Sequence, residues 1–144
     1  MVGALGAVGS SVAHGLVDLG HDVVRVSSRA PLNDDPAVRS FEDAIALMHS
    51  GNIDLVVNAA VPGDHRSGRD TWESTTSLFG SAIASAGIRG IVLSTTRVLE
   101  GYDADFSENS PATARTEYAQ KNARNEELWL ASGGHCAGVL RLAN

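Results

Sequence analysis

The chain has 144 residues, enough for one domain with a hydrophobic core of its own. It is 43% hydrophobic and 19% charged, and its net charge of −6 argues against nucleic acid or an anionic membrane as the main partner. No apolar run approaches the ~18 residues of a membrane span. The single cysteine, Cys136, cannot form an internal disulfide, so we expect a protein of the reducing cytoplasm.

Three glycines spaced G-x-x-G-x-x-G stand at the start of the chain, at Gly3, Gly6 and Gly9. The first permits a tight turn, the second lets a phosphate approach the backbone, and the third lets a helix pack closely on a strand. The unpaired N–H groups at the N-terminus of the following helix favour negative charge. The pattern predicts a turn between strand and helix that binds the pyrophosphate of a dinucleotide.

The strand before this turn has only Met1 and Val2 to form it, so we expect it to be truncated and its neighbours to lack pairing. The rest of the chain alternates between β and α patterns. In chain order we expect a helix over 10–19, a strand over 22–26, room for a short strand within 30–38, a helix between 40 and 51, a strand over 53–58, a helix over 72–86, a strand over 88–93, a helix over 116–131 and a strand over 136–142. This alternation predicts an α/β fold, a doubly wound, Rossmann-like parallel sheet with strand order 3-2-1-4-5-6.

Two local patterns make finer predictions. An apolar stripe on the first helix, ending at Val17, is expected to face the sheet. Ser40 with Asp43 three residues later is a capping box that predicts a helix start, and Gly51 predicts its end.

Four further motifs stand in a characteristic order after the glycines. They are Asn58-Ala59-Ala60, the segment Ser-Thr-Thr-Arg-Val-Leu-Glu-Gly over 94–101, the segment Tyr-Ala-Gln-Lys-Asn over 118–122, and the segment Val-Leu-Arg-Leu-Ala-Asn over 139–144. Together they resemble the extended short-chain dehydrogenases/reductases, the NAD-dependent epimerase/dehydratase group that works on nucleotide sugars. The layout is most similar to the dTDP-4-dehydrorhamnose reductase branch. The resemblance implies an oxidoreductase or epimerase whose partner is a nucleotide-sugar substrate.

The resemblance also implies roles for individual residues. Tyr118 is the expected acid/base, and Thr95 is the hydroxyl that orients the substrate oxygen. A lysine four residues after the tyrosine holds the nicotinamide ribose in the family, but Asn122 stands at that position and Lys121 lies one residue before it. The family's asparagine in the preceding helix has no counterpart over 71–86. We therefore expect weak or absent turnover from this chain alone, with Lys121 kept as a catalytic candidate.

The end of the second strand bears on the choice of cofactor. An NAD-preferring domain places an acidic residue about 20 residues beyond the glycines. Ser27 stands there instead, and Arg29 follows, which suits a 2′-phosphate and predicts NADP over NAD. No metal site is expected. The full set of expected cofactor-binding residues is Gly3, Gly6, Ala7, Val8, Gly9, Ser27, Arg29, Asn58, Ala59, Ala60 and Asn122.

Alternatives to an active enzyme remain open. One alternative interpretation is a catalytically degenerate dinucleotide-binding or regulatory member of the family. Residues 1–144 are also interpreted as one NAD(P)-binding domain of a longer protein that lacks its C-terminal substrate portion, with a homodimer as a compensating arrangement. A loop over 63–69, rich in charge, is a weaker candidate for contact with a substrate diphosphate.

Overall fold

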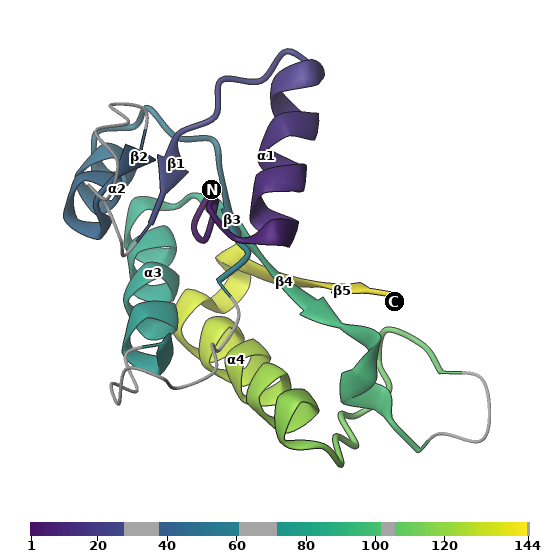
Figure 1. Ribbon diagram of the computed structural model, residues 1–144. Coiled ribbons are helices and arrows are strands. Elements are labelled where there is room, and N and C mark those ends of the chain that lie inside the picture. Colours follow the sequence, from purple (N-terminus) through teal and green to yellow (C-terminus); the bar gives the residue numbers. More distant parts are fainter. Residues whose placement is uncertain (28–37, 61–71, 102–105, 144) are drawn as a thin grey trace.

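The computed structural model describes residues 1–27, 38–60, 72–101 and 106–143, and it places helices on both faces of a parallel sheet (Figure 1). The elements are α1 (Ala7–Asp18), β1 (Arg25–Val26), β2 (Val38–Arg39), α2 (Phe41–His49), β3 (Leu55–Asn58), α3 (Trp72–Ala86), β4 (Arg89–Thr95), the 3₁₀ turn η1 (Thr96–Leu99), α4 (Glu117–Gly133), the 3₁₀ turn η2 (Gly134–Cys136) and β5 (Ala137–Leu142). The alternation expected from the sequence is confirmed. Within the described residues, no helix is both long and apolar enough to cross a membrane.

The sheet has the predicted strand order. β1 pairs with β2, and β4 lies between β3 and β5, all in parallel. Val2 joins the two groups, because it forms parallel bridges to Val26 on one side and Asn58 on the other. Counting the Val2 segment as the first strand, the order is 3-2-1-4-5-6, as in a doubly wound Rossmann-like sheet.

The first strand is short, yet Met1 and Val2 pair with both neighbours. Val2 N–H donates to the Val57 carbonyl (2.8 Å) and the Val2 carbonyl accepts from Ala59 N–H (2.9 Å). On the other side the Met1 carbonyl accepts from Val26 N–H (2.9 Å). The expected loss of pairing is therefore wrong at these residues, because Val2 directs both of its backbone groups to β3 while Met1 bonds to β1.

Two apolar layers cover the two faces of the sheet. On one face α2, α3 and α4 pack over Val56 and Val92, with Phe79, Ile83 and Trp129 almost fully buried. On the other face α1 covers a smaller cluster around Val57 and Leu93, which it contacts through Val12. Val17 is 55% exposed, so its expected inward position is wrong: α1 covers little of the sheet and only the middle of its apolar stripe is buried.

Local signals explain where the helices begin and end. The Ser40 hydroxyl accepts from Asp43 N–H (3.1 Å) as the predicted cap of α2, and Gly51 follows that helix with φ +75°. The Thr116 hydroxyl caps α4 by accepting from Ala119 N–H (3.3 Å). This cap fixes the first turn of α4, which carries Tyr118.

The buried amine of Met1 predicts a pH dependence of stability. It donates to the Val24 carbonyl (2.8 Å), and burial lowers its pKa from 8.0 to about 6. Between these values the unfolded chain binds more protons than the folded chain, so stability rises with pH from about 6 to about 8. At about 1.4 kcal/mol per pKa unit, the gain is at most about 3 kcal/mol.

We expect the midpoint of thermal unfolding to rise across this window. The control is the chain acetylated at Met1, which keeps an N–H donor but cannot titrate. An equally steep rise in the acetylated chain would contradict the assignment of this dependence to the Met1 amine.

Candidate cofactor and active site

The glycine turn is packed so tightly that two of its glycines have no room for a side chain. Gly3 has φ +74°, and a Cβ there would lie 2.7 Å from Ala60 N. A Cβ on Gly9 would collide with the Gly3 carbonyl oxygen. Gly6 differs, because its φ is −77° and a Cβ there would lie at an ordinary 3.5 Å from Gly3 O. The fold itself thus requires glycine at positions 3 and 9 but not at position 6.

The N-terminus of α1 opens directly from this turn. Gly6 is its N-cap, no side chain bonds to the first turn, and that turn has no acidic residue. The first helical hydrogen bond runs from Ser10 N–H to Gly6 O (2.8 Å), so the N–H groups of Ala7, Val8 and Gly9 precede it without helical partners. Uncapped N–H groups at the positive end of a helix fit a pyrophosphate.

The segment after β3 lies against the glycine turn. Ala59 and Ala60 are the neighbours that a Cβ on Gly3 would meet, so two motifs far apart in sequence come together here. Asn58 is fully buried, and its Oδ1 accepts from Ala60 N–H (3.0 Å), which bends the chain away from the strand. Its Nδ2 and the Ser94 hydroxyl on β4 are buried atoms without a partner among the described residues.

Only part of the expected 2′-phosphate site lies in the described residues. Ser27 follows β1, is 8% exposed, and donates its N–H to the Arg39 carbonyl (3.2 Å). Its place at the carboxyl end of β1 agrees with the expected one. Arg29 and the loop over 63–69 lie outside the described residues.

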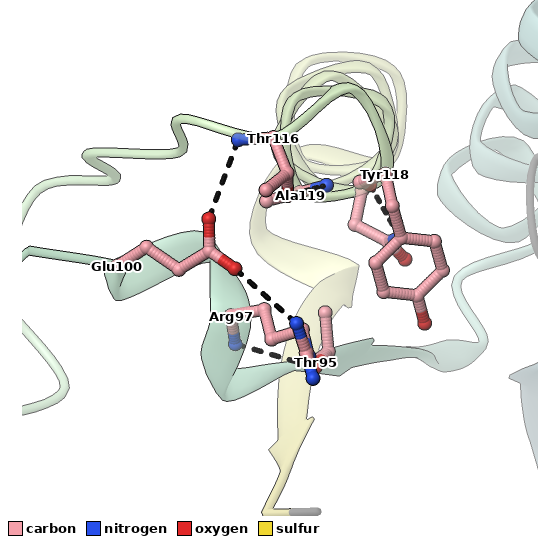
Figure 2. Close-up of polar contacts among 7 residues, drawn as sticks. Thr95, Arg97, Glu100, Thr116, Tyr118 and Ala119 are labelled. Atoms are coloured by element: carbon pink, nitrogen blue, oxygen red, sulfur yellow. Dashed lines mark hydrogen bonds and ion pairs between the residues drawn. The ribbon is translucent and has the colours of Figure 1, made fainter.

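The candidate catalytic hydroxyls come from two elements that meet beyond the carboxyl end of β4. Thr95 ends β4 and is 4% exposed, and its Oγ1 accepts from Arg97 N–H (3.2 Å). Tyr118 lies in the first turn of α4 and is 46% exposed. Figure 2 shows the tyrosine ring extending from α4 on the side where β4 ends at Thr95. The hydroxyl hydrogen of Thr95 stays available as a donor, because its oxygen accepts the backbone bond.

Glu100 is a residue of this site that the sequence reasoning did not identify as functional. Its Oε2 accepts from Thr116 N–H (3.3 Å), and its Oε1 pairs with Arg97 Nη1 at 3.6 Å (Figure 2). The Glu100 carbonyl also accepts from the Thr113 hydroxyl (2.8 Å). Glu100 therefore links η1, which follows Thr95, to the cap of α4. The sequence signal for this role was the position of Glu100 three residues after Arg97, within the 94–101 motif.

Lys121 and Asn122 point to different partners. Lys121 Nζ pairs with Glu117 Oε1 at 2.7 Å along the outer side of α4. Asn122 is 2% exposed, and its Nδ2 donates to the Tyr118 carbonyl (2.8 Å). The structure thus places Asn122 beside Tyr118 inside the fold and pairs Lys121 with a carboxylate that is itself exposed.

A buried ion pair fixes α4 on the sheet. Glu126 is 5% exposed and accepts two bonds from Arg141 on β5, at 3.0 Å from Nε and 2.8 Å from Nη2. Bonding to Glu126 raises the pKa of Arg141 above its ordinary value, although burial opposes this. The bidentate pair sets the position of the helix that carries Tyr118.

The candidate site lies along one edge of the sheet and has two parts. Near α1, backbone N–H groups lie at the positive end of the helix. Near α4, the hydroxyl-bearing side chains of Thr95 and Tyr118 come from the end of β4 and the first turn of α4. Among the described residues, no group of three or more acidic, histidine or cysteine side chains is placed to bind a metal ion.

Comparisons with solved structures agree with this architecture. A structure of MoeE5 in complex with UDP-glucuronic acid and NAD has a TM-score of 0.71 and 28% identity, and the match covers 97% of this chain and 52% of that one. The dTDP-glucose 4,6-dehydratase of Bacillus anthracis, in complex with NAD, has a TM-score of 0.73 and 16% identity over 97% of this chain and 52% of that one. The UDP-N-acetylglucosamine 4-epimerase of Bacillus cereus has a TM-score of 0.73 and 18% identity, covering 97% and 57%.

The two matches below 25% identity bear on the fold alone. The chain spans about half the length of these solved structures. No curated protein matches the sequence. The sequence profile of the NAD dependent epimerase/dehydratase family matches residues 1–144, and the chain therefore belongs to that family.

Proposed function

We propose that this chain is the cofactor-binding part of an NAD(P)-dependent oxidoreductase or epimerase that acts on a nucleotide-activated sugar. The observation that carries the proposal is the N-terminus of α1, which has no side-chain cap. It follows a turn whose packing requires glycine at positions 3 and 9 but not at position 6. Packing inside the turn does not require glycine at position 6, and the absence of a side chain there leaves space outside the turn. In that space a pyrophosphate would contact Ala7, Val8 and Gly9. In support, MoeE5 structures at 28% and 26% identity contain NAD with UDP-glucuronic acid or UDP-glucose.

The proposed cofactor is NADP(H) in preference to NAD(H). The preference rests on Ser27, which occupies the end of β1 where an acidic residue would bond the ribose 2′-hydroxyl. A hydroxyl there leaves room for a 2′-phosphate and brings no charge repulsion. MoeE5 and the dTDP-glucose 4,6-dehydratase named above are in complex with NAD, so this preference would distinguish the chain from them.

The proposed chemistry is proton transfer by Tyr118 with substrate orientation by Thr95. A bound nicotinamide would supply hydride transfer. The Thr95 hydroxyl, fixed by its bond from Arg97 N–H, would donate to the substrate oxygen, while the phenol of Tyr118 would give or take the proton. Reduction of a 4-keto group, the reaction of the dehydrorhamnose reductase branch, and oxidation followed by re-reduction at a sugar carbon both use this arrangement.

A second candidate function is dinucleotide binding without turnover. Asn122 favours it, since this buried amide turns back to the Tyr118 carbonyl and supplies no positive charge. The side chain of Lys121, the residue before Asn122, pairs with Glu117 at 2.7 Å. The proton-transfer machinery therefore lacks a group that the family places beside its tyrosine, whereas the pyrophosphate site is intact.

Gly6→Ala separates cofactor binding from folding. The methyl group fits within the protein but fills the space outside the turn, so we expect the Kd for NADPH to rise at least tenfold. Stability should change by no more than about 1 kcal/mol. Isothermal titration calorimetry and thermal unfolding measure the two effects. Gly15→Ala in the same helix is the matched control, because a Cβ there meets nothing within 4 Å, and it should leave binding unchanged. Equal affinity in Gly6→Ala and Gly15→Ala would contradict the proposed site.

Gly9→Ala should instead destabilise the fold by about 1–3 kcal/mol, since its methyl collides with the Gly3 carbonyl. Chemical denaturation measures this loss. A variant that remains as stable as the unaltered chain would show that the turn is looser than described.

The choice between the two dinucleotides depends on Ser27. We expect tighter binding of NADPH than of NADH, and Ser27→Asp should reverse the order by repelling the 2′-phosphate. Ser27→Ala, which adds no charge, is the control and should still bind NADPH more tightly than NADH. Fluorescence titration of each of the three proteins with each reduced cofactor gives the six affinities needed. Tighter NADH binding by the unaltered chain would refute the NADP assignment.

Tyr118 and Asn122 distinguish catalysis from binding alone. With NADPH and a nucleotide-linked 4-keto sugar, Tyr118→Phe should lower the rate of cofactor oxidation by about 10²–10⁴-fold, the usual contribution of an acid/base group. Asn122→Lys, which restores a cation one helical turn from Tyr118, should raise the rate. Binding of NADPH with no turnover in either the unaltered chain or Asn122→Lys would favour the non-catalytic alternative.

A further inference from the structure

Arg97 brings a guanidinium into the turn that follows Thr95, and the proposed chemistry uses only the backbone of this residue. Arg97 N–H donates to Thr95 Oγ1 (3.2 Å), so the turn that fixes the orienting hydroxyl also carries a cation. In Figure 2 the Arg97 side chain extends from η1 toward the side on which the Tyr118 ring lies. A positive charge therefore lies at the part of the site where a substrate oxygen would be held.

The contacts of this guanidinium leave most of its donors available. The Arg97 side chain is 55% exposed. Among the described residues it pairs with Glu100 alone, from Nη1 to Oε1 at 3.6 Å, which is longer than a hydrogen bond. A guanidinium has five N–H donors in a fixed plane. The edge formed by Nε and Nη2 therefore has no protein acceptor within the described part of the chain.

Another arginine of this chain shows what that edge can bind. Arg141 donates to Glu126 from Nε (3.0 Å) and from Nη2 (2.8 Å), the bidentate geometry that suits a carboxylate. Arg97 has the same edge, but there it is open to solvent. An external carboxylate can therefore bind Arg97 in the way that Glu126 binds Arg141.

Glu100 holds the guanidinium in place without using all of its donors. Glu100 Oε2 accepts from Thr116 N–H (3.3 Å) at the cap of α4, so the carboxylate is fixed, and Oε1 faces Arg97 Nη1. A fixed partner on the Nη1 side restricts the conformations of Arg97 before a ligand arrives, which lowers the entropic cost of binding. The negative charge of Glu100 also repels a second anion from that side, so a ligand carboxylate must approach Nε and Nη2.

The position of Arg97 next to Thr95 indicates which group of a nucleotide sugar it would contact. Thr95 is proposed to orient the oxygen on the reacting sugar carbon, and the nearest substituents belong to the adjacent carbons. For reaction at C4 one neighbour is C5, which bears a carboxylate in uronic acids and a neutral hydroxymethyl group in ordinary hexoses. The diphosphate is attached at C1, across the ring from C4. A cation beside the reacting oxygen is therefore better placed for a C5 carboxylate than for the diphosphate.

We propose that Arg97 is a specificity-determining residue that binds the carboxylate of a uronic-acid nucleotide sugar through Nε and Nη2, with Glu100 setting the position of the guanidinium. This inference rests on the proposed function, and it narrows the substrate class from nucleotide sugars in general to those with a carboxylate at C5. A neutral sugar leaves the same donors of Arg97 to water.

The test compares UDP-galacturonic acid with UDP-galactose, which differ only in the carboxylate or hydroxymethyl group at C5. Isothermal titration calorimetry in the presence of NADPH measures both Kd values. We expect the acid to bind at least about tenfold more tightly, the usual contribution of hydrogen bonds to a charged group. Arg97→Gln should remove this preference by weakening the acid without changing the Kd for UDP-galactose. Arg97→Lys, which keeps the charge but not the paired donors, should retain only part of it.

Arg124→Gln is the matched control. Arg124 is 52% exposed and pairs with Glu127 three residues later (3.2 Å), much as Arg97 pairs with Glu100, but its second partner is Glu73 on α3. This variant should leave both Kd values unchanged. Glu100→Gln, which removes the competing charge and keeps an acceptor for Thr116 N–H, should tighten binding of the acid. The thermal midpoints of these variants should stay within about 4 °C of the unaltered chain, because exposed ion pairs contribute little stability.

Two results would overturn the carboxylate site while leaving the proposed function in place. They are equal Kd values for the two sugars in the unaltered chain, and an unchanged preference for the acid in Arg97→Gln. Failure to bind either sugar while NADPH still binds would contradict the nucleotide-sugar substrate of the proposed function, and it would overturn this inference as well.

Discussion

The two-sided pairing of Val2 is the constraint on which the rest of the structure depends. Its bonds to Val57 and Ala59, with the bond from Val26 to Met1, unite β1 and β3 in a single sheet. The chain then turns at Gly3, so α1 starts at the carboxyl edge of the strands, with no side-chain cap from the described residues. If this pairing were absent, the glycine turn would have no fixed direction relative to Ala59 and Ala60.

The order of elements could be predicted from sequence because local signals agree with each other. The Ser40 cap, the glycine after α2 and the alternation of apolar runs each favour the same assignment. The pairing of Val2 could not be predicted by counting residues, since a parallel bridge depends on where neighbouring strands lie in space. The exposure of Val17 was missed for a related reason: periodicity gives the apolar stripe of a helix but not how much of that stripe the sheet covers.

The candidate site, like the fold, could be predicted from the sequence only in part. Sequence order placed the glycines, Asn58, Thr95 and Tyr118 at one edge of the sheet, since parallel strands bring their carboxyl ends together. The contacts that fix them were not predictable in this way. Glu100 reaches the cap of α4 across a loop, and Glu126 is bonded twice by Arg141 from another strand. The pairing of Lys121 with Glu117 could have been read from sequence, because a glutamate four residues before a lysine is a favourable helical pair.

The two halves of the site differ in what they depend on. The proposed pyrophosphate site uses backbone N–H groups, whose position follows from the φ angles and close packing of glycines, and few side-chain changes elsewhere would remove them. The proposed proton-transfer site depends on side chains, and at Asn122 the side chain differs from the family pattern and bonds inward. Dinucleotide binding is therefore the more robust part of the proposed function, and loss of a single cation beside Tyr118 would reduce catalysis while leaving binding in place.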